Sequence, residues 1–198
     1  MLIDKTVQGF LAELASDSPA PGGGSVSALA GALSASLCSM VMSLSKGEKY
    51  AAVADQVAMV KEEALKLQAF FIKSIDADTA AFNELMATFK LPKDTDEAKR
   101  VRSAAIQKAT QKATMLPLSV AENCLPIIKL ARTALAIGNP NANSDGKVAI
   151  VCAHAAFYGA IYNVEINLGS IKDPEFVKDI ETKVKDLKEE LNALNLVF

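Results

Sequence analysis

Two aspartates stand two residues apart in the stretch Ile75–Phe82, and only one of them shares the apolar face of the helix predicted there. Helical spacing places Asp78 among large apolar side chains and turns Asp76 almost to the opposite face. A carboxylate in apolar surroundings must be paired, protonated or functional, because an unpaired buried charge is costly. Asp78 is therefore a candidate general acid or base, and the structural alternative is that it caps or bridges a neighbouring helix.

Three consecutive glycines, Gly22–Gly24, precede a segment built mainly of Ala, Ser, Leu and Gly. If a helix starts there, its first backbone N–H groups lack helical partners and can bind an anion. The loop lacks the Lys-Ser or Lys-Thr pair of a Walker loop, and no predicted strand precedes it as a dinucleotide fingerprint requires. On their own, the glycines fit a tight turn as well as a ligand-binding loop.

Further polar residues fall in the second half of the chain. The Asn-rich segment 138–145 has residue types that suit turns and helix caps. Asn163 and Asn167 lie in a predicted apolar helix, where a side-chain amide needs a partner such as another helix or a polar heterocycle. His154, the only histidine, is interpreted as a core residue because no second ligand accompanies it, and its role stays open.

The elements that must position these residues are all helical, since Ala, Leu, Lys and Glu dominate and strand-like alternation is lacking. The sequence predicts an all-α fold: a single-domain helical bundle over residues 1–198 with long central helices. We expect helices over 4–15, from about 23 to 46, over 51–89, from about 95 to 137, from about 145 to 168, and from about 174 to the C-terminus.

Several residues predict where these helices begin, end or break. Gly47 is a plausible C-cap of the second helix, and Glu97 is placed for a capping box at the start of the fourth. Ser144 or Asp145 should cap the fifth helix. The prolines should kink or split the region 112–137, because proline lacks the backbone N–H that a helix needs. These prolines are Pro117 and Pro126.

The second helix is unusual because small residues form two of its rows. Its large apolar residues form a third row, which we interpret as an apolar seam: Val26, Leu29, Leu33, Leu37, Met40 and Leu44. Rows of small residues let another helix approach closely. With almost no charge before Lys46, this helix should be buried on most sides, and a second copy of the chain is one candidate neighbour.

Composition sets limits on the class of protein. The 198 residues are 51% hydrophobic and 22% charged with a net charge of −2, a balance typical of a globular domain. Without a basic patch there is no reason to expect a nucleic-acid partner. The N-terminus lacks the apolar block of a signal peptide, and the many serines in 26–44 argue against a membrane span. Three widely spaced cysteines indicate reduced thiols in a cytoplasmic protein.

Four segments, in order along the chain, resemble the formiminotransferase-cyclodeaminase family in its cyclodeaminase/cyclohydrolase domain. They are PAPGGGSVSALAGAL, IDADTAAFNELMATFKLPK, GNPNANSD and GAIYNVEINL. The family includes formiminotetrahydrofolate cyclodeaminase domains and stand-alone methenyltetrahydrofolate cyclohydrolases. The resemblance covers nearly the whole chain and implies an all-helical homodimer that acts on one-carbon tetrahydrofolates.

The resemblance also implies the residues of the site. It makes Asp78 the catalytic carboxylate, in agreement with its place on the apolar face. A tetrahydrofolate derivative is implied as substrate and carrier, and no metal is expected because the methenyl carbon is already electrophilic. The implied substrate-binding positions are Gly22, Gly23, Gly24, Ser25, Asp76, Asn143, Ser144, Asp145 and Asn163.

Three functions stay open at this point. The first is hydrolysis of 5,10-methenyltetrahydrofolate to 10-formyltetrahydrofolate, which is favoured because the chain has no room for the formiminotransferase domain of bifunctional relatives. The second is a cyclodeaminase that releases ammonia and gives 5,10-methenyltetrahydrofolate. The third is a non-catalytic folate-binding or scaffold dimer. The anionic glutamate tail suits the N–H groups of Gly22–Gly24 or Lys46, and a site within one subunit or shared between two fits the motifs equally.

Overall fold

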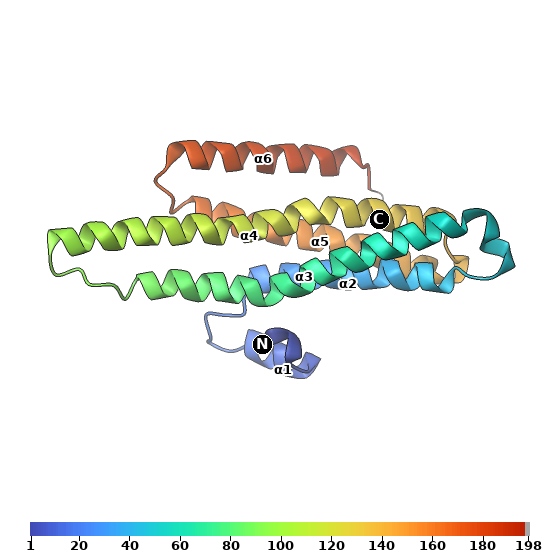
Figure 1. Cartoon of the computed structure of the whole chain (residues 1–198), viewed down its shortest axis with the longest axis horizontal. Helices are drawn as coiled ribbons and strands as arrows, with labels where there is room; N and C mark the ends of the chain where they lie inside the picture. Colours follow the sequence, from blue (N-terminus) through green and yellow to red (C-terminus); the bar gives the residue numbers. More distant parts are fainter. Residues whose placement is uncertain (197–198) are drawn as a thin grey trace.

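Four long helices form the body of the protein in the computed structural model, which describes residues 1–196. They are α2 (Gly23–Leu44), α3 (Ala54–Thr88), α4 (Asp96–Ile137) and α5 (Asn143–Leu168). α2 packs against α3 and α5, and α4 packs against the same two helices and closes the bundle (Figure 1). No strand occurs among the described residues, so the all-α prediction is confirmed.

Shorter elements flank this body. A 3-10 turn (Leu2–Asp4) and α1 (Val7–Leu14) lie below the bundle in Figure 1, and their residues Leu2 and Phe10 pack into its core. α6 (Pro174–Ala193) lies outside α4 and α5 on the other side. Two further 3-10 turns, Glu48–Val53 and Pro140–Ala142, lead into α3 and α5. In the same view, α3 and α4 extend past the start of α2 and the end of α5 as a two-helix arm.

α4 runs unbroken through Pro117 and Pro126, so the expected split is wrong. A proline leaves the carbonyl four residues earlier without a helical partner. For Pro117 that carbonyl belongs to Ala113, and it accepts a hydrogen bond of 3.3 Å from the Asn167 side chain on α5. A contact from a neighbouring helix thus satisfies the group that the proline releases.

The predicted start of α4 at about residue 95 is confirmed by its N-cap Thr95, whereas two other predicted helix ends are wrong. Glu97 lies one residue too early for the predicted capping box. α5 begins at Asn143 after a 3-10 turn, so the segment 144–145 lies inside its first turn and does not cap it. α2 ends before Gly47, whose φ of 93° is a left-handed conformation that favours glycine and turns the chain toward α3.

α2 buries most of its small residues, whereas four of the six large residues of the predicted apolar seam are exposed, although the helix was expected to be buried on most sides. Val26, Leu33, Met40 and Leu44 are 37–50% exposed. Small side chains face the core because they allow the neighbouring helices to approach closely. The buried small residues are Gly24, Ser25, Ser27, Ala28, Gly31, Ala32, Ser34, Ala35, Cys38 and Ser39.

Two segments are long and apolar enough to cross a membrane by length and composition alone, Gly23–Leu44 and Pro140–Leu168. In the most apolar part of each, 61% and 44% of the residues are buried inside the fold. The core helix of a soluble protein passes the same test, so this is a weak indication of a span. The expectation that the chain has no membrane partner stays a prediction.

We expect Gly31→Ala to destabilise the fold, because the new Cβ would lie 2.6 Å from the Cδ1 atom of the fully buried Phe71 ring. The overlap should cost about 1–3 kcal/mol of unfolding free energy, partly offset by the roughly 1 kcal/mol gain in helix propensity. Urea denaturation measures the difference. Gly169→Ala is the matched control, since its Cβ would meet only a carbonyl oxygen at 3.5 Å. Equal stability of the two variants would contradict the close helix packing.

Candidate active site

Asp78 lies where α3 meets the N-terminus of α2. The first backbone N–H groups of α2 belong to Gly23, Gly24 and Ser25, which have no acceptor within the helix. The Ser25 hydroxyl donates to Asp78 Oδ2 at 3.0 Å. A negative charge at this position also interacts favourably with the helix dipole. The Asp78 side chain therefore bridges α3 to the first turn of α2, a contact that the structural alternative includes.

The glycines of α2 make room for this contact. A Cβ on Gly24 would overlap the Asp78 carboxylate. A Cβ on Gly23 would approach the Asn163 amide nitrogen to 3.1 Å, tighter than an ordinary contact. A Cβ on Gly22 would meet no atom within 4 Å. Close approach thus requires glycine at the second position of α2, whereas Gly22 faces open space.

Burial raises the pKa of Asp78 above its ordinary value, and hydrogen bonds from the Ser25 hydroxyl and backbone lower it only in part. The Ser25 hydroxyl is fully buried and also lies 2.9 Å from the Ile75 carbonyl oxygen. A serine hydroxyl has one proton, so these two oxygens compete for it. A raised pKa makes the carboxyl a stronger base when it is ionised, which favours a role in general acid and base catalysis.

Asp78 opens onto a cleft of about 340 Å³ that α2, α3, α4 and α5 enclose together. Phe82 and Leu85 of α3 give it an apolar wall, and Asn163 and Asn167 of α5 contribute amides. Asp78 is the only ionisable residue in the lining. An apolar wall facing amides suits a flat heterocycle with donors and acceptors. The lining residues are Pro19, Ala20, Gly22, Gly23, Gly24, Asp78, Ala81, Phe82, Leu85, Ala113, Asn163, Ile166 and Asn167.

The structure brings one group of the predicted site residues together. Gly22–Gly24, Asp78 and Asn163 line the cleft, and Ser25 lies directly behind the carboxylate. Asp76 lies outside the cleft, where it accepts a hydrogen bond from the backbone N–H of Leu2. Binding roles for these residues stay predictions.

A second group of predicted residues lies at the opposite end of α5. Asn143, Ser144 and Asp145 occupy the first turn of α5, 20 residues before Asn163. At the helical rise this separation is about 30 Å. Their side chains make no hydrogen bond or ion pair within residues 1–196. One chain therefore does not place them in the cleft with Asp78.

Other cleft residues were not predicted as site residues. Asn167 follows Asn163 by four residues on the same helix face, and this spacing is a signal that the sequence does contain. Phe82 and Leu85 belong to the predicted apolar face of α3. Beyond Asp78 this face lines the cleft instead of packing in the core. Ala113 has no sequence signal, because its role depends on which helix packs beside it.

The histidine and the cysteines lie outside this cleft. His154 is half-buried on α5 with its ring centroid 4.9 Å from that of Tyr158, and burial lowers its pKa. The three cysteines are free, and burial raises the pKa of Cys38 to about 12. Residues 1–196 contain no cluster of three or more His, Cys, Asp or Glu side chains that could hold a metal ion.

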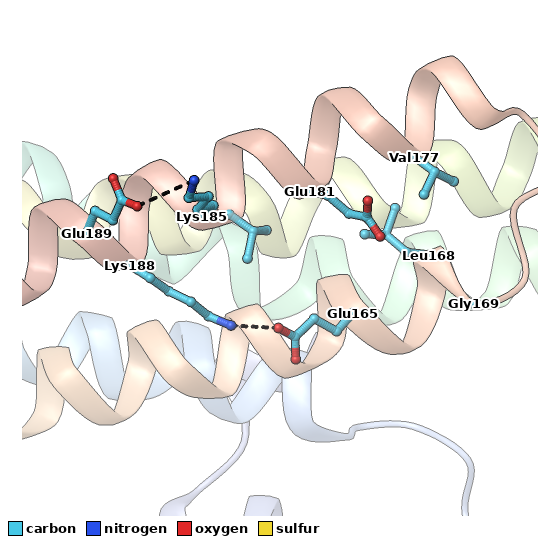
Figure 2. A pocket seen from close by; sticks show the side chains of 9 residues that line it. Glu165, Leu168, Gly169, Val177, Glu181, Lys185, Lys188 and Glu189 are labelled. Atoms are coloured by element: carbon cyan, nitrogen blue, oxygen red, sulfur yellow. Dashed lines mark hydrogen bonds and ion pairs between the residues drawn. The ribbon is translucent and has the colours of Figure 1, made fainter.

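A larger groove of about 610 Å³ lies between α5 and α6 (Figure 2). Four of its five charged side chains pair with one another: Lys188 lies 2.7 Å from Glu165, and Lys185 lies 3.8 Å from Glu189. The fifth, Glu181, has no ion pair within residues 1–196. Exposed pairs of this kind leave little charge for a ligand. The smaller cleft, with a partly buried carboxyl at its end, is the better candidate for an active site.

Comparisons with known proteins agree with the fold. Residues 6–186 match the family described as formiminotransferase-cyclodeaminase. A methenyltetrahydrofolate cyclohydrolase from Methylorubrum extorquens is 37% identical over 97% of this chain and 93% of that protein. A formimidoyltransferase-cyclodeaminase from Sus scrofa is 32% identical over 96% of this chain, which spans only 35% of that protein. The crystal structure of a formiminotetrahydrofolate cyclodeaminase from Thermotoga maritima has the same fold (TM-score 0.86, 23% identity, 98% and 93% coverage).

The raised pKa of Asp78 predicts that Asp78→Asn is more stable than the wild type at pH 8. A fold that raises the pKa of a carboxyl favours its protonated form. The protonated carboxyl therefore adds to the free energy of unfolding. This gain is complete when the pH is below the pKa of the carboxyl in the unfolded chain, about 3.9, and it is lost as the pH rises through the higher pKa in the folded protein. The neutral amide avoids this loss, so the two proteins should differ little at pH 4. Urea denaturation at both pH values provides the measurement, and a variant less stable at pH 8 would favour a structural cap.

Proposed function

The chain belongs to the formiminotransferase-cyclodeaminase family, and we propose that it hydrolyses 5,10-methenyltetrahydrofolate to 10-formyltetrahydrofolate. The observation that carries this proposal is the nearly end-to-end match, at 37% identity, with a protein named methenyltetrahydrofolate cyclohydrolase. The cleft supports it with one partly buried carboxyl, an apolar wall and side-chain amides.

The proposed reaction begins with water attack on the methenyl carbon, which is part of a cationic ring between N5 and N10. Asp78 in its ionised form takes one proton from the water as the C–O bond forms. Asp78 then returns this proton to N5, the C–N5 bond breaks, and the hydroxyl oxygen releases its proton as the formyl carbonyl forms. One carboxyl thus acts first as base and then as acid, for which a raised pKa is favourable.

The same carboxyl can stabilise the substrate before the reaction. The methenyl ring carries a positive charge, and an ionised Asp78 within a partly desolvated cleft would attract it. Phe82 and Leu85 would contact the flat pterin ring, and Asn163 and Asn167 would bond to its polar edge. The Asp78 carboxylate lies against the start of α2, where it would repel the anionic glutamate tail, so the tail needs positive charge from elsewhere.

A second candidate function is supported by relatives named formimidoyltransferase-cyclodeaminase, at 32% identity for the Sus scrofa protein. In that reaction N10 attacks the formimino carbon, and Asp78 would protonate the departing ammonia. Both reactions pass through a tetrahedral carbon bonded to N5 and N10, so the same cleft could serve either. The two differ in the products that an assay detects.

The proposed enzyme is a homodimer, as the family resemblance implies. Large apolar side chains of α2 remain exposed in the single chain, and a second copy would cover them. The expectation of a cytoplasmic location stays a prediction.

A paired assay tests the proposed function. The purified protein should accelerate the loss of methenyl absorbance from 5,10-methenyltetrahydrofolate and release no ammonia from 5-formiminotetrahydrofolate. Ammonia release would favour the cyclodeaminase, and no turnover of either substrate would refute both candidates.

Asp78→Asn should lower kcat by about 100-fold or more, because the amide can neither take nor return the proton. Asp55→Asn is the control variant, since that exposed carboxyl lies on the same helix and does not line the cleft. Its kcat should stay within a few-fold of the wild type. Similar losses in the two variants would contradict the assignment of acid and base chemistry to Asp78.

A further inference from the structure

The Ser25 hydroxyl lies among three oxygen atoms, more than a single proton can serve. Its Oγ atom lies 2.9 Å from the Ile75 carbonyl oxygen, 3.0 Å from Asp78 Oδ2 and 3.3 Å from Thr79 Oγ1. A serine hydroxyl donates one proton and accepts at two lone pairs. The carbonyl can only accept, so the other two neighbours decide where the proton of Ser25 goes.

Thr79 differs from other threonines inside the long helices. Thr110 and Thr114 each donate to the carbonyl four residues earlier in their own helix. For Thr79 that carbonyl belongs to Ile75, and Ser25 of α2 bonds to it instead. Among residues 1–196, Ser25 is the only hydrogen-bond partner of the Thr79 hydroxyl. Thr79 is half-buried and does not line the cleft, so its hydroxyl serves Ser25 and not a ligand.

The protonation state of Asp78 determines the direction of these bonds. An ionised carboxyl can only accept, and the Ser25 proton is best placed on it, because hydrogen bonds to an ionised acceptor are the stronger ones. The Ile75 carbonyl lies inside α3 and keeps its helical partner. A protonated carboxyl can instead donate to Ser25, which frees the Ser25 proton for the carbonyl. Thr79 can donate to Ser25 in both states, since two lone pairs accept two donors.

We propose that Ser25 and Thr79 are positioning residues for the acid and base chemistry of Asp78. The Ser25 proton points to Oδ2 while the carboxyl is ionised and turns to the Ile75 carbonyl when the carboxyl is protonated. Thr79 donates to Ser25 in both states. This inference rests on the proposed function, in which Asp78 acts first as a base and then as an acid.

The hydroxyl arrangement suits a carboxyl that changes its protonation twice in one turnover. The proton that Asp78 takes from water stays on the carboxyl until it is returned to N5, and Ser25 keeps its own proton throughout. Each change therefore needs only the rotation of a hydroxyl, and no heavy atom has to move. The bonds of Ser25 are satisfied in both states, so neither state leaves a buried donor without a partner.

The burial of Ser25 separates this role from contact with a ligand. Ser25 is 0% exposed and is absent from the lining of the cleft. Gly24 packs against the same carboxyl, and its missing side chain leaves Asp78 the space to reach Ser25. Ser25 therefore acts on the carboxyl, in place of the substrate contact that the family resemblance implies.

Asp78 is the only titratable residue in the cleft lining, so a pH effect can be assigned to it. α2 has no charged side chain, and burial raises the pKa of its Cys38 thiol to about 12, so this thiol stays protonated. Charged groups on the surrounding elements lie outside the lining: Asp17 before α2, Asp76 and Glu84 on α3, Lys112 on α4, and Glu165 on α5. Asp17 is exposed, Asp76 bonds to the Leu2 backbone, and both glutamates pair with lysines.

Four variants test the two hydroxyls. Ser25→Ala removes the donor to Asp78 and inserts a residue that favours a helix. Thr79→Val removes the hydroxyl and keeps the branched shape, whereas Thr79→Ser keeps the hydroxyl. Thr110→Val is the control, because that hydroxyl bonds to its own helix and lies outside the cleft. Thermal unfolding verifies that each variant is folded.

Loss of the Ser25 donor should raise the pKa of Asp78, because this donor stabilises the charged form. The acid limb of the pH profile of kcat/KM should move to higher pH by about 1–2 units in Ser25→Ala. Above that limb the activity should approach that of the wild type. Thr79→Val should move the limb the same way by about 0.3 units or more. Thr79→Ser and Thr110→Val should leave it in place.

NMR titration of isotope-labelled aspartate, assigned with Asp78→Asn, measures the same shifts without substrate. An unchanged titration in Ser25→Ala would overturn the role of Ser25, as would a higher KM with an unchanged kcat, which marks a substrate contact. Equal shifts in Thr79→Ser and Thr79→Val would overturn the role of Thr79. A wild type with the expected titration and no turnover would refute the proposed function, whereas turnover without any shift in the variants would refute only the hydroxyl arrangement.

Discussion

The contact between the Asp78 carboxylate and the N-terminus of α2 is the constraint on which the rest of the site depends. It requires glycine at position 24, because any side chain there would overlap the carboxylate. It also requires a hydroxyl at Ser25 that is buried together with the acid. The same contact joins two central helices and places a proton-exchanging group at the end of a cleft. Asp78 therefore contributes both to the packing of the two helices and to the proposed chemistry. Both roles depend on how closely α2 approaches α3.

That close approach explains the composition of α2. Small side chains face the core, and the ring of Phe71 lies over Gly31 without room for a methyl group. Val26, Leu33, Met40 and Leu44 lie on the opposite side of the helix and are 37–50% exposed. α2 is therefore apolar on both sides, and only the side with the small residues serves the packing of its own chain.

The fold and the centre of the site could be predicted from the sequence because they rest on local patterns. The absence of strand alternation predicted the all-α class. The spacing of the apolar residues placed Asp78 on the apolar face of its helix and Asp76 on nearly the opposite face. Pro174 correctly marked the start of the last helix. The burial of α2 could not be predicted, because small and large rows both look like core until the neighbouring helices are known. The separation of about 30 Å between Asn143 and Asn163 follows from their spacing along one predicted helix, whereas the helices that meet at each end of it depend on the topology.

Pro117 gives the cleft a property that neither wall would have alone. An ordinary helix satisfies its own carbonyls and can slide along a neighbour at little cost. The carbonyl of Ala113 is bonded instead to Asn167, at one position along α5. This hydrogen bond joins α4 to α5 beside the cleft and favours one alignment of the two helices. A proline inside an unbroken helix thus provides a free carbonyl to which the neighbouring helix is bonded at the edge of the cleft.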